Sequence, residues 1–204
     1  KALDMNEGST NNERVCLDDT NLTTASSTNC NGSGDIFDKA EAVRTSSLWY
    51  KADEVDTQQV LFEQGGWGKG QVIYLDEGKI FACTTKNYAA VCVSSITTAN
   101  EWHHVALAWA SGTTSYLYHD GVQVADFTGK DNADTTQSSA LGNIAGDTNM
   151  TDDIAQRAPY SNDGVIGEFS FDGIIDEFRV SNSTRSTDYI ATDYNNQNTG
   201  TWQA

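Results

Sequence analysis

Apolar and polar residues alternate with a period of two through most of the chain, and turn-forming residues separate the alternating runs. This pattern is typical of half-buried β-strands, because successive side chains of a strand point to opposite faces of a sheet. We therefore predict an all-β protein in which antiparallel strands form a two-sheet sandwich. The predicted strands are Ala2–Asn6, Val43–Lys51, Gln59–Glu63, Gln71–Asp76, Lys79–Thr84, Ala90–Ile96, Trp102–Ala110, Thr114–His119, Val122–Phe127, Ala140–Ala145, Gly167–Phe171 and Ile174–Ser181.

Two local signals add to this pattern. Ser186 or Thr187 can cap a short helix that continues through Tyr194, and no other segment has a helical pattern. Asp120-Gly121 predicts a tight hairpin turn, because glycine tolerates a positive φ that matches the twist of the flanking strands. Two stretches, 7–39 and 131–164, carry no periodic pattern and are predicted to be functional or mobile loops.

Size and charge limit the possible partners. The 204 residues suffice for one compact domain that buries roughly 70% of its unfolded surface, so we expect a single domain over 1–204. Twelve Lys and Arg against 29 Asp and Glu give a net charge of −17, which opposes binding to nucleic acid or to anionic lipid. No apolar run is long enough to span a bilayer, and no positively charged start is followed by an apolar stretch, so we expect any secretion signal to lie outside this chain. We expect it to be part of a larger protein.

The four cysteines predict an oxidising compartment. Cys83 and Cys92 lie at equal distances from the turn 86–89, so a hairpin over residues 79–95 would place them opposite each other. Cys16 and Cys30 bracket a polar loop, and a bridge between them would remove on the order of 3 kcal/mol of chain entropy from the unfolded state. The spacing does not match a zinc site. Two disulfides and an extracytoplasmic location are therefore expected.

The stretch from Phe171 to Asn182 contains the first candidate for ion binding. Strict alternation would place Ile174, Asp176, Phe178 and Val180 on one buried face of a strand. An ionised carboxylate among apolar neighbours is costly unless it is neutralised or coordinates a cation, and calcium prefers oxygen ligands. The alternative is an Asp176 that accepts backbone N–H bonds or lies at a sheet edge.

Several motifs resemble one family, the bacterial laminin-G-like domains with a concanavalin A-like lectin-glucanase jelly-roll fold. They follow the order expected for the family and cover nearly the whole chain. The motifs are Glu101-Trp102-His103-His104-Val105-Ala106-Leu107, Tyr118-His119-Asp120-Gly121-Val122, Gly173-Ile174-Ile175-Asp176-Glu177-Phe178-Arg179-Val180-Ser181-Asn182, Arg185-Ser186 and Tyr194-Asn195-Asn196-Gln197.

The resemblance implies a jelly-roll sandwich of two curved antiparallel sheets. It also implies a structural calcium ion near the last strand, with Asp176 as a ligand and backbone carbonyls of the N-terminal region as further ligands. The opening strand of the family, which would precede Ala2, is expected to be missing.

The resemblance also allows a catalytic role, because the same fold occurs in glycosidases. Retaining glycosidases need two closely spaced carboxylates, which jelly-roll members supply from a Glu-x-Asp-x-x-Glu motif. Here Glu54 and Asp56 match the motif, but Gln59 replaces the second glutamate and cannot protonate a leaving group. The Glu54 and Asp56 carboxylates are expected to face solvent. No catalytic residues are therefore assigned.

The three histidines also give no active site. His103 and His104 should point to opposite faces of one strand, so packing and hydrogen bonding explain them better than a metal pair. His119 precedes the Asp120-Gly121 turn and is expected to be exposed. No nucleophile elbow accompanies it, so no hydrolase triad can be assigned.

Two aromatic residues are the candidates for ligand binding. Trp67 lies within Gly65–Gly70, a predicted hairpin connection at the tip of the sandwich, and Tyr160 lies in an unpatterned stretch. Exposed aromatic rings can stack on the apolar face of a sugar. The alternative is that Trp67 folds back over a sheet edge.

Three functions remain open because a fold does not determine function. The first is a non-catalytic, calcium-stabilised extracellular binding or adhesion module for a carbohydrate or surface ligand, within a larger bacterial surface or secreted protein of the adhesin or pilus-associated type. Its partners would be a glycan or cell-surface ligand and the other domains of the same polypeptide. The second is a purely structural spacer, and the third is a glycoside hydrolase or polysaccharide lyase.

Overall fold

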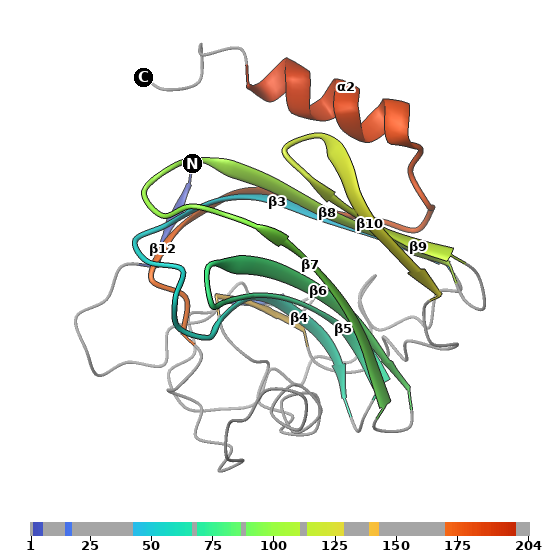
Figure 1. Ribbon diagram of the computed structural model, residues 1–204, viewed down its shortest axis with the longest axis horizontal. Coiled ribbons are helices and arrows are strands. Elements are labelled where there is room, and N and C mark those ends of the chain that lie inside the picture. The colour runs from blue at the N-terminus through green and yellow to red at the C-terminus, as the bar shows by residue number, and fades with distance from the viewer. Residues whose placement is uncertain are drawn as a thin grey trace.

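The computed structural model of the protein describes residues 2–5, 15–17, 43–66, 69–86, 89–110, 114–128, 139–142 and 170–198. Two antiparallel sheets face each other, and one helix lies across the outer side of the first sheet (Figure 1). This arrangement confirms the predicted all-β sandwich.

The first sheet has the order β1-β12-β3-β8-β9-β10. Every neighbouring pair is antiparallel. Its strands are β1 (Leu3–Asp4), β12 (Gly173–Ser181), β3 (Val43–Ala52), β8 (His103–Ala110), β9 (Thr114–His119) and β10 (Val122–Thr128).

The second sheet has the order β2-β11-β4-β5-β6-β7 and is also antiparallel. Its strands are β2 (Val15–Cys16), β11 (Ser139–Leu141), β4 (Gln59–Gly66), β5 (Lys69–Asp76), β6 (Lys79–Lys86) and β7 (Ala89–Ile96).

The main core fills the space between the two sheets. Alternate residues of the central strands supply it, because strand side chains with a period of two reach the same face. Each fully buried aliphatic or aromatic side chain contributes about 1.5–3 kcal/mol. The core includes Leu48, Tyr50, Val105, Leu107, Trp109 and Leu117 from the first sheet and Leu61, Phe62, Ile73, Leu75, Ile80 and Ala82 from the second.

Helix α2 (Thr187–Gln197) covers the outer face of the first sheet (Figure 1). Ser186 is its N-cap, as one of the two predicted caps, and its hydroxyl accepts a hydrogen bond from the Tyr189 N–H at 3.2 Å. Ile190 is the buried residue of the helix, and it packs against Ala106, Ala108 and Tyr118 of the sheet. Within the described residues, no helix is long enough and apolar enough to span a bilayer.

Most of the predicted strands are present, and three local predictions differ. The strand expected over Ala140–Ala145 corresponds to β11, which ends at Leu141, and residues 143–145 lie outside the described residues. Of the strand expected over Gly167–Phe171, residues 167–169 lie outside the described residues, and Phe171 belongs to no strand. Two short strands complete the sheets: β1 occupies part of the predicted Ala2–Asn6 strand, whereas β2 lies inside the stretch 7–39 that had no pattern. The predicted connection Gly65–Gly70 is shorter than expected, because Gly66 pairs with Lys69 as part of the β4–β5 ladder.

The prediction of one buried face on β12 is wrong. A register shift interrupts the pairing of β12 with β3 between Asp176 and Arg179, and Glu177 has a φ of 50°. This bulge moves Phe178 to the core side, where it joins Ile175. Asp176 and Phe178 therefore point to opposite faces, since an added residue reverses the alternation.

Candidate functional site

The Trp-His-His run divides its two histidines between the faces of the first sheet, as predicted. His103 pairs with Tyr50 and His104 pairs with Trp49 in the β3–β8 ladder. The His103 ring lies 5.6 Å from the ring of Tyr50, a core residue, whereas the His104 ring lies 5.4 Å from that of Trp49. His103 thus points between the sheets, and His104 points toward α2.

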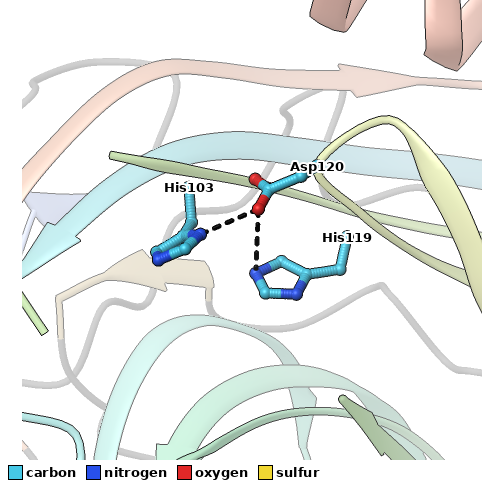
Figure 2. Close-up of side chains that lie close together, drawn as sticks. All are labelled: His103, His119 and Asp120. Carbon is cyan, nitrogen blue, oxygen red and sulfur yellow. Dashed lines mark hydrogen bonds and ion pairs between the residues drawn. The ribbon is translucent and has the colours of Figure 1, made fainter. Parts of the chain in front are cut away.

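Asp120 brings His103 and His119 together at one end of the sandwich. Asp120 and Gly121 have φ values of 50° and 74°, so the predicted tight turn between β9 and β10 is confirmed. The carboxylate Oδ2 lies 2.9 Å from His103 Nδ1 and 3.9 Å from His119 Nε2, and both rings turn toward it (Figure 2). The other oxygen, Oδ1, accepts the His104 N–H at 2.8 Å, and the Asp120 N–H donates to the His104 carbonyl at 2.8 Å.

Hydroxyl groups surround the two imidazoles. The Thr98 hydroxyl lies 2.9 Å from His103 Nε2, and the Tyr50 hydroxyl lies 3.2 Å from His119 Nε2. The Tyr50 hydroxyl also bonds the Thr97 hydroxyl at 2.7 Å. Residues from three segments far apart in the sequence thus fix the orientation of both rings.

Burial governs the charges of this cluster. Removal from water lowers the pKa of His119, although Asp120 opposes the shift. The pKa of Asp120 is also lowered: burial raises it, but the hydrogen bonds from His103 and from the His104 N–H outweigh that cost. Burial raises the pKa of the Tyr50 hydroxyl. The cluster therefore combines an ionised carboxylate with a neutral His119 at pH 7.

The expectation that His119 is exposed is wrong. His119 is only 8% exposed, because its register partner Val105 lies in the core and its ring stacks beside Tyr50. One nitrogen or oxygen each from His103, His119 and Asp120 lies within 4.8 Å of the others. The sequence shows that His119 directly precedes Asp120-Gly121. It does not show that His103 lies close to them, because this depends on the pairing of β8 with β9.

A second polar region lies on the opposite face, beneath α2. Tyr194 of the helix stacks on Trp49 with ring centroids 5.4 Å apart and planes 11° apart, and Gln197 accepts a hydrogen bond from the Trp49 indole. Burial lowers the pKa of His104 to about 4, although Asp193 on α2 raises it. This contact region anchors the helix to the sheet.

A cleft of about 390 Å³ opens between α2, β3 and β12. Arg179 bridges Asp193 of the helix and Glu177 of β12, with both distances 2.6 Å, and the Arg185 guanidinium lies 4.5 Å from the centroid of the Tyr189 ring. The cleft thus combines hydroxyl groups, an aromatic ring and charges of both signs. Such groups can bind a polar ligand. The cleft is lined by Thr45, Ser47, His104, Phe178, Arg179, Val180, Ser181, Arg185, Tyr189, Ile190 and Asp193.

Asp176, the predicted calcium ligand, lies outside the core. It pairs with Trp49 and is therefore on the sheet face that α2 covers, where it is half-buried. Its Oδ1 accepts the Glu177 N–H at 2.9 Å. Within the described ranges, three His, Cys, Asp or Glu side chains converge only at His103, His119 and Asp120, and Asp176 is not part of such a group. Calcium binding at Asp176 stays a prediction.

The other candidates divide between confirmed positions and positions outside the described residues. The disulfide Cys83–Cys92 is present with an S–S distance of 2.04 Å, as its cross-strand register predicted. Trp67 and Tyr160, the predicted ligand-binding residues, lie outside the described residues, and so does Cys30, the predicted partner of Cys16.

The glycosidase-like motif forms a turn. Both oxygens of Glu54 accept hydrogen bonds from its own segment, including the Asp56 N–H at 3.0 Å and the Thr57 N–H at 3.2 Å. Gln59 donates to Glu54 and accepts the Asp172 N–H at 2.8 Å. Asp56 is exposed, as expected. The Glu54 carboxylate and the Gln59 amide are thus held by hydrogen bonds of this local turn.

Comparisons with solved structures return domains of the same fold. The binding domain of botulinum neurotoxin serotype G aligns with a TM-score of 0.58 and 10% identity over 77% of this chain and 37% of the toxin domain. The binding domain of botulinum neurotoxin DC, solved in complex with SialylT, aligns with a TM-score of 0.57 and 9% identity over 80% of this chain and 38% of that one. This chain thus spans less than two fifths of those toxin domains.

A SAP-like pentraxin from Limulus polyphemus is also similar, with a TM-score of 0.55 and 13% identity over 76% of this chain and 70% of the pentraxin. A search of the curated proteins found no significant sequence match. The profile of the laminin G-like family described as the concanavalin A-like lectin/glucanases superfamily matches residues 17–191, well over half of the sequence. The chain therefore belongs to this family of concanavalin A-like domains.

Proposed function

We propose that the chain is a non-catalytic module that binds a carbohydrate or another surface ligand outside the cytoplasm, within a larger bacterial surface or secreted protein. The observation that carries the proposal is the concanavalin A-like sandwich, whose structural neighbours include toxin binding domains and one domain solved with SialylT. The disulfide Cys83–Cys92 supports an oxidising compartment. The local hydrogen bonds of Glu54 support a non-catalytic role.

Two surfaces are candidates for the ligand. The cleft beneath α2 offers Tyr189, which is 45% exposed, together with Arg185 and several hydroxyl groups. Sugar rings stack on aromatic side chains while polar groups bond their hydroxyls. Trp67 remains the alternative that the sequence predicts.

A glycan array probed with the whole chain, followed by calorimetric titration of each hit, tests the proposal. If the cleft is the site, Tyr189→Ala and Arg185→Ala should each weaken binding by about tenfold or more, the loss expected for a contact worth about 1.4 kcal/mol. Trp67→Ala should have that effect if the predicted loop binds. Ile96→Ala, at a residue that is 76% exposed on the second sheet, serves as the control.

The outcomes separate the three functions. Binding that Ile96→Ala preserves and a cleft or Trp67 variant loses would support the module. No binding to any glycan would contradict it in favour of a structural spacer. Cleavage of a polysaccharide that Glu54→Gln together with Asp56→Asn abolishes would contradict the non-catalytic assignment.

A further inference from the structure

The cluster of His103, His119 and Asp120 has the donors of a transition-metal site. Two imidazole nitrogens and one carboxylate oxygen converge within 4.8 Å of one another, from the start of β8 and from the end of β9 with its turn. Such a set suits zinc, which prefers nitrogen and mixed nitrogen and oxygen ligands, better than calcium, which takes oxygen ligands alone. We propose that His103 Nδ1, His119 Nε2 and a carboxylate oxygen of Asp120 bind one zinc ion.

The geometry needs only small movements to accept the ion. Zinc binds nitrogen and oxygen at about 2.0–2.1 Å, so neighbouring ligands in a tetrahedron lie roughly 3.4 Å apart. Asp120 Oδ2 is 2.9 Å from His103 Nδ1 and 3.9 Å from His119 Nε2, which brackets that separation. A shift of the carboxylate and a rotation of the rings would equalise these distances.

The surrounding hydroxyls match the second layer that metal-binding histidines require. When His103 binds through Nδ1, its ring proton moves to Nε2, where the Thr98 hydroxyl can accept it at the present 2.9 Å. The Tyr50 hydroxyl now contacts His119 Nε2, and it keeps its bond to Thr97 when the metal takes that nitrogen. The His103 ring and the Tyr50 hydroxyl therefore each keep a hydrogen-bond partner in both states.

Access and charge favour a cation at this point. The side chains of His103 and His119 are 11% and 7% exposed, whereas that of Asp120 is 35% exposed, so the cluster opens to solvent on the carboxylate side. The ion would gain its fourth ligand, a water molecule, from that side. The chain carries a net charge of −17, which raises the local concentration of dications.

The test is a calorimetric titration of the chelator-treated chain with Zn²⁺ in excess calcium, which blocks sites made of carboxylates alone. We expect one equivalent of zinc to bind, and Co²⁺ in its place to give the visible absorption of a tetrahedral nitrogen and oxygen site. His119→Gln and Asp120→Asn should each weaken zinc binding by on the order of 100-fold. Thr98→Ala, at an exposed residue of the second layer, should weaken it by about tenfold.

His104→Gln is the matched control, because His104 is the third histidine of the chain and points to the other face. It should bind zinc as wild type does. The proposal is overturned if wild type binds no zinc under these conditions, or if His104→Gln loses as much affinity as His119→Gln. It is also overturned if Thr98→Ala and Asp120→Asn, shown to be folded by circular dichroism, both bind zinc as tightly as wild type.

Discussion

Asp120 connects the β9–β10 turn to the start of β8 through its side chain and its backbone. Its backbone and Oδ1 bond the backbone of His104, and its Oδ2 contacts the His103 ring. Hydrogen bonds to an ionised carboxylate are about twice as strong as those between neutral groups. These hydrogen bonds therefore stabilise the contact between the β9–β10 turn and the start of β8.

Asp176 is the residue at which calcium binding can be tested. We expect calcium to raise the Tm of wild type by several degrees, because a ligand at about 100 times its Kd stabilises the native state by about 2.7 kcal/mol. Asp176→Asn should remove this response, and Asp126→Asn, at an exposed residue of β10, should keep it. Differential scanning calorimetry of zinc-free protein with calcium or with a chelator measures the effect. Equal Tm values of wild type in both buffers would contradict the prediction.

Among the described residues, no group of three His, Cys, Asp or Glu side chains includes Asp176, so side chains there supply only part of a calcium site. Calcium takes six to eight oxygens, and Asp176 offers one carboxylate whose Oδ1 already accepts the Glu177 N–H. The other ligands would be backbone carbonyls or residues outside the described ranges. Main-chain ligands leave no mark in a sequence, so neither the pattern nor the family motif could predict them.

The β5–β6 and β9–β10 hairpins have the same turn geometry. Glu77-Gly78 joins β5 to β6 and Asp120-Gly121 joins β9 to β10, and all four residues have a positive φ. A Cβ on Gly121 would lie 2.7 Å from Tyr194 Cδ1 of α2, whereas one on Gly78 would meet nothing nearer than Asp56 Oδ1 at 3.9 Å. The β9–β10 turn is therefore also a contact surface for the helix.

Gly121→Ala should destabilise the protein more than Gly78→Ala does. Both substitutions place alanine at a positive φ, which costs about 1–2 kcal/mol. Gly121→Ala adds the clash with Tyr194, and overpacking of this kind costs about 1–3 kcal/mol more. Urea unfolding of the two variants and of wild type measures the difference. Equal losses for the two variants would show that the helix does not rest on this turn.

Elements whose signal is local could be predicted from the sequence. The Asp120-Gly121 turn, the Ser186 cap and the Cys83–Cys92 pairing each depend on residues close together in the chain. The bulge of β12 could not be predicted, because the residue with the positive φ is Glu177 and not a glycine, which would have marked the position in the sequence. The burial of His119 was missed for another reason: it depends on Tyr50, a residue from a distant strand.

At the scale of the whole molecule, the first sheet is covered on both faces. Its inner side packs on the second sheet, and its outer side carries α2 with Trp49, His104 and Tyr194 (Figure 1). His104 is only 2% exposed as a result. A sequence that alternates strictly would leave that outer face to solvent, so the buried His104 follows from the docked helix and could not be predicted from the strand pattern.

Global stability should fall as the pH drops from about 6.5 toward 4. Burial lowers the pKa of His104 from 6.5 to about 4, with Asp193 and Asp120 opposing the shift and Arg179 and His119 adding to it. In this range the unfolded chain binds a proton at His104 that the native protein does not, so protonation favours unfolding. The two pKa values correspond to a loss of about 3 kcal/mol across the range. The lowered pKa of His119 acts in the same direction.

Comparison of wild type with His104→Gln isolates this contribution from the titration of the many carboxylates. Glutamine does not titrate, so the free energy of unfolding of the variant should fall less steeply between pH 6.5 and 4.5, whatever its value at pH 7. Urea unfolding at several pH values gives both slopes. Because His104 is buried only when α2 covers the sheet, a shallower slope in the variant would also show that the helix stays docked in solution. Parallel slopes would mean that His104 is solvated in the native protein and that α2 is not held against this face.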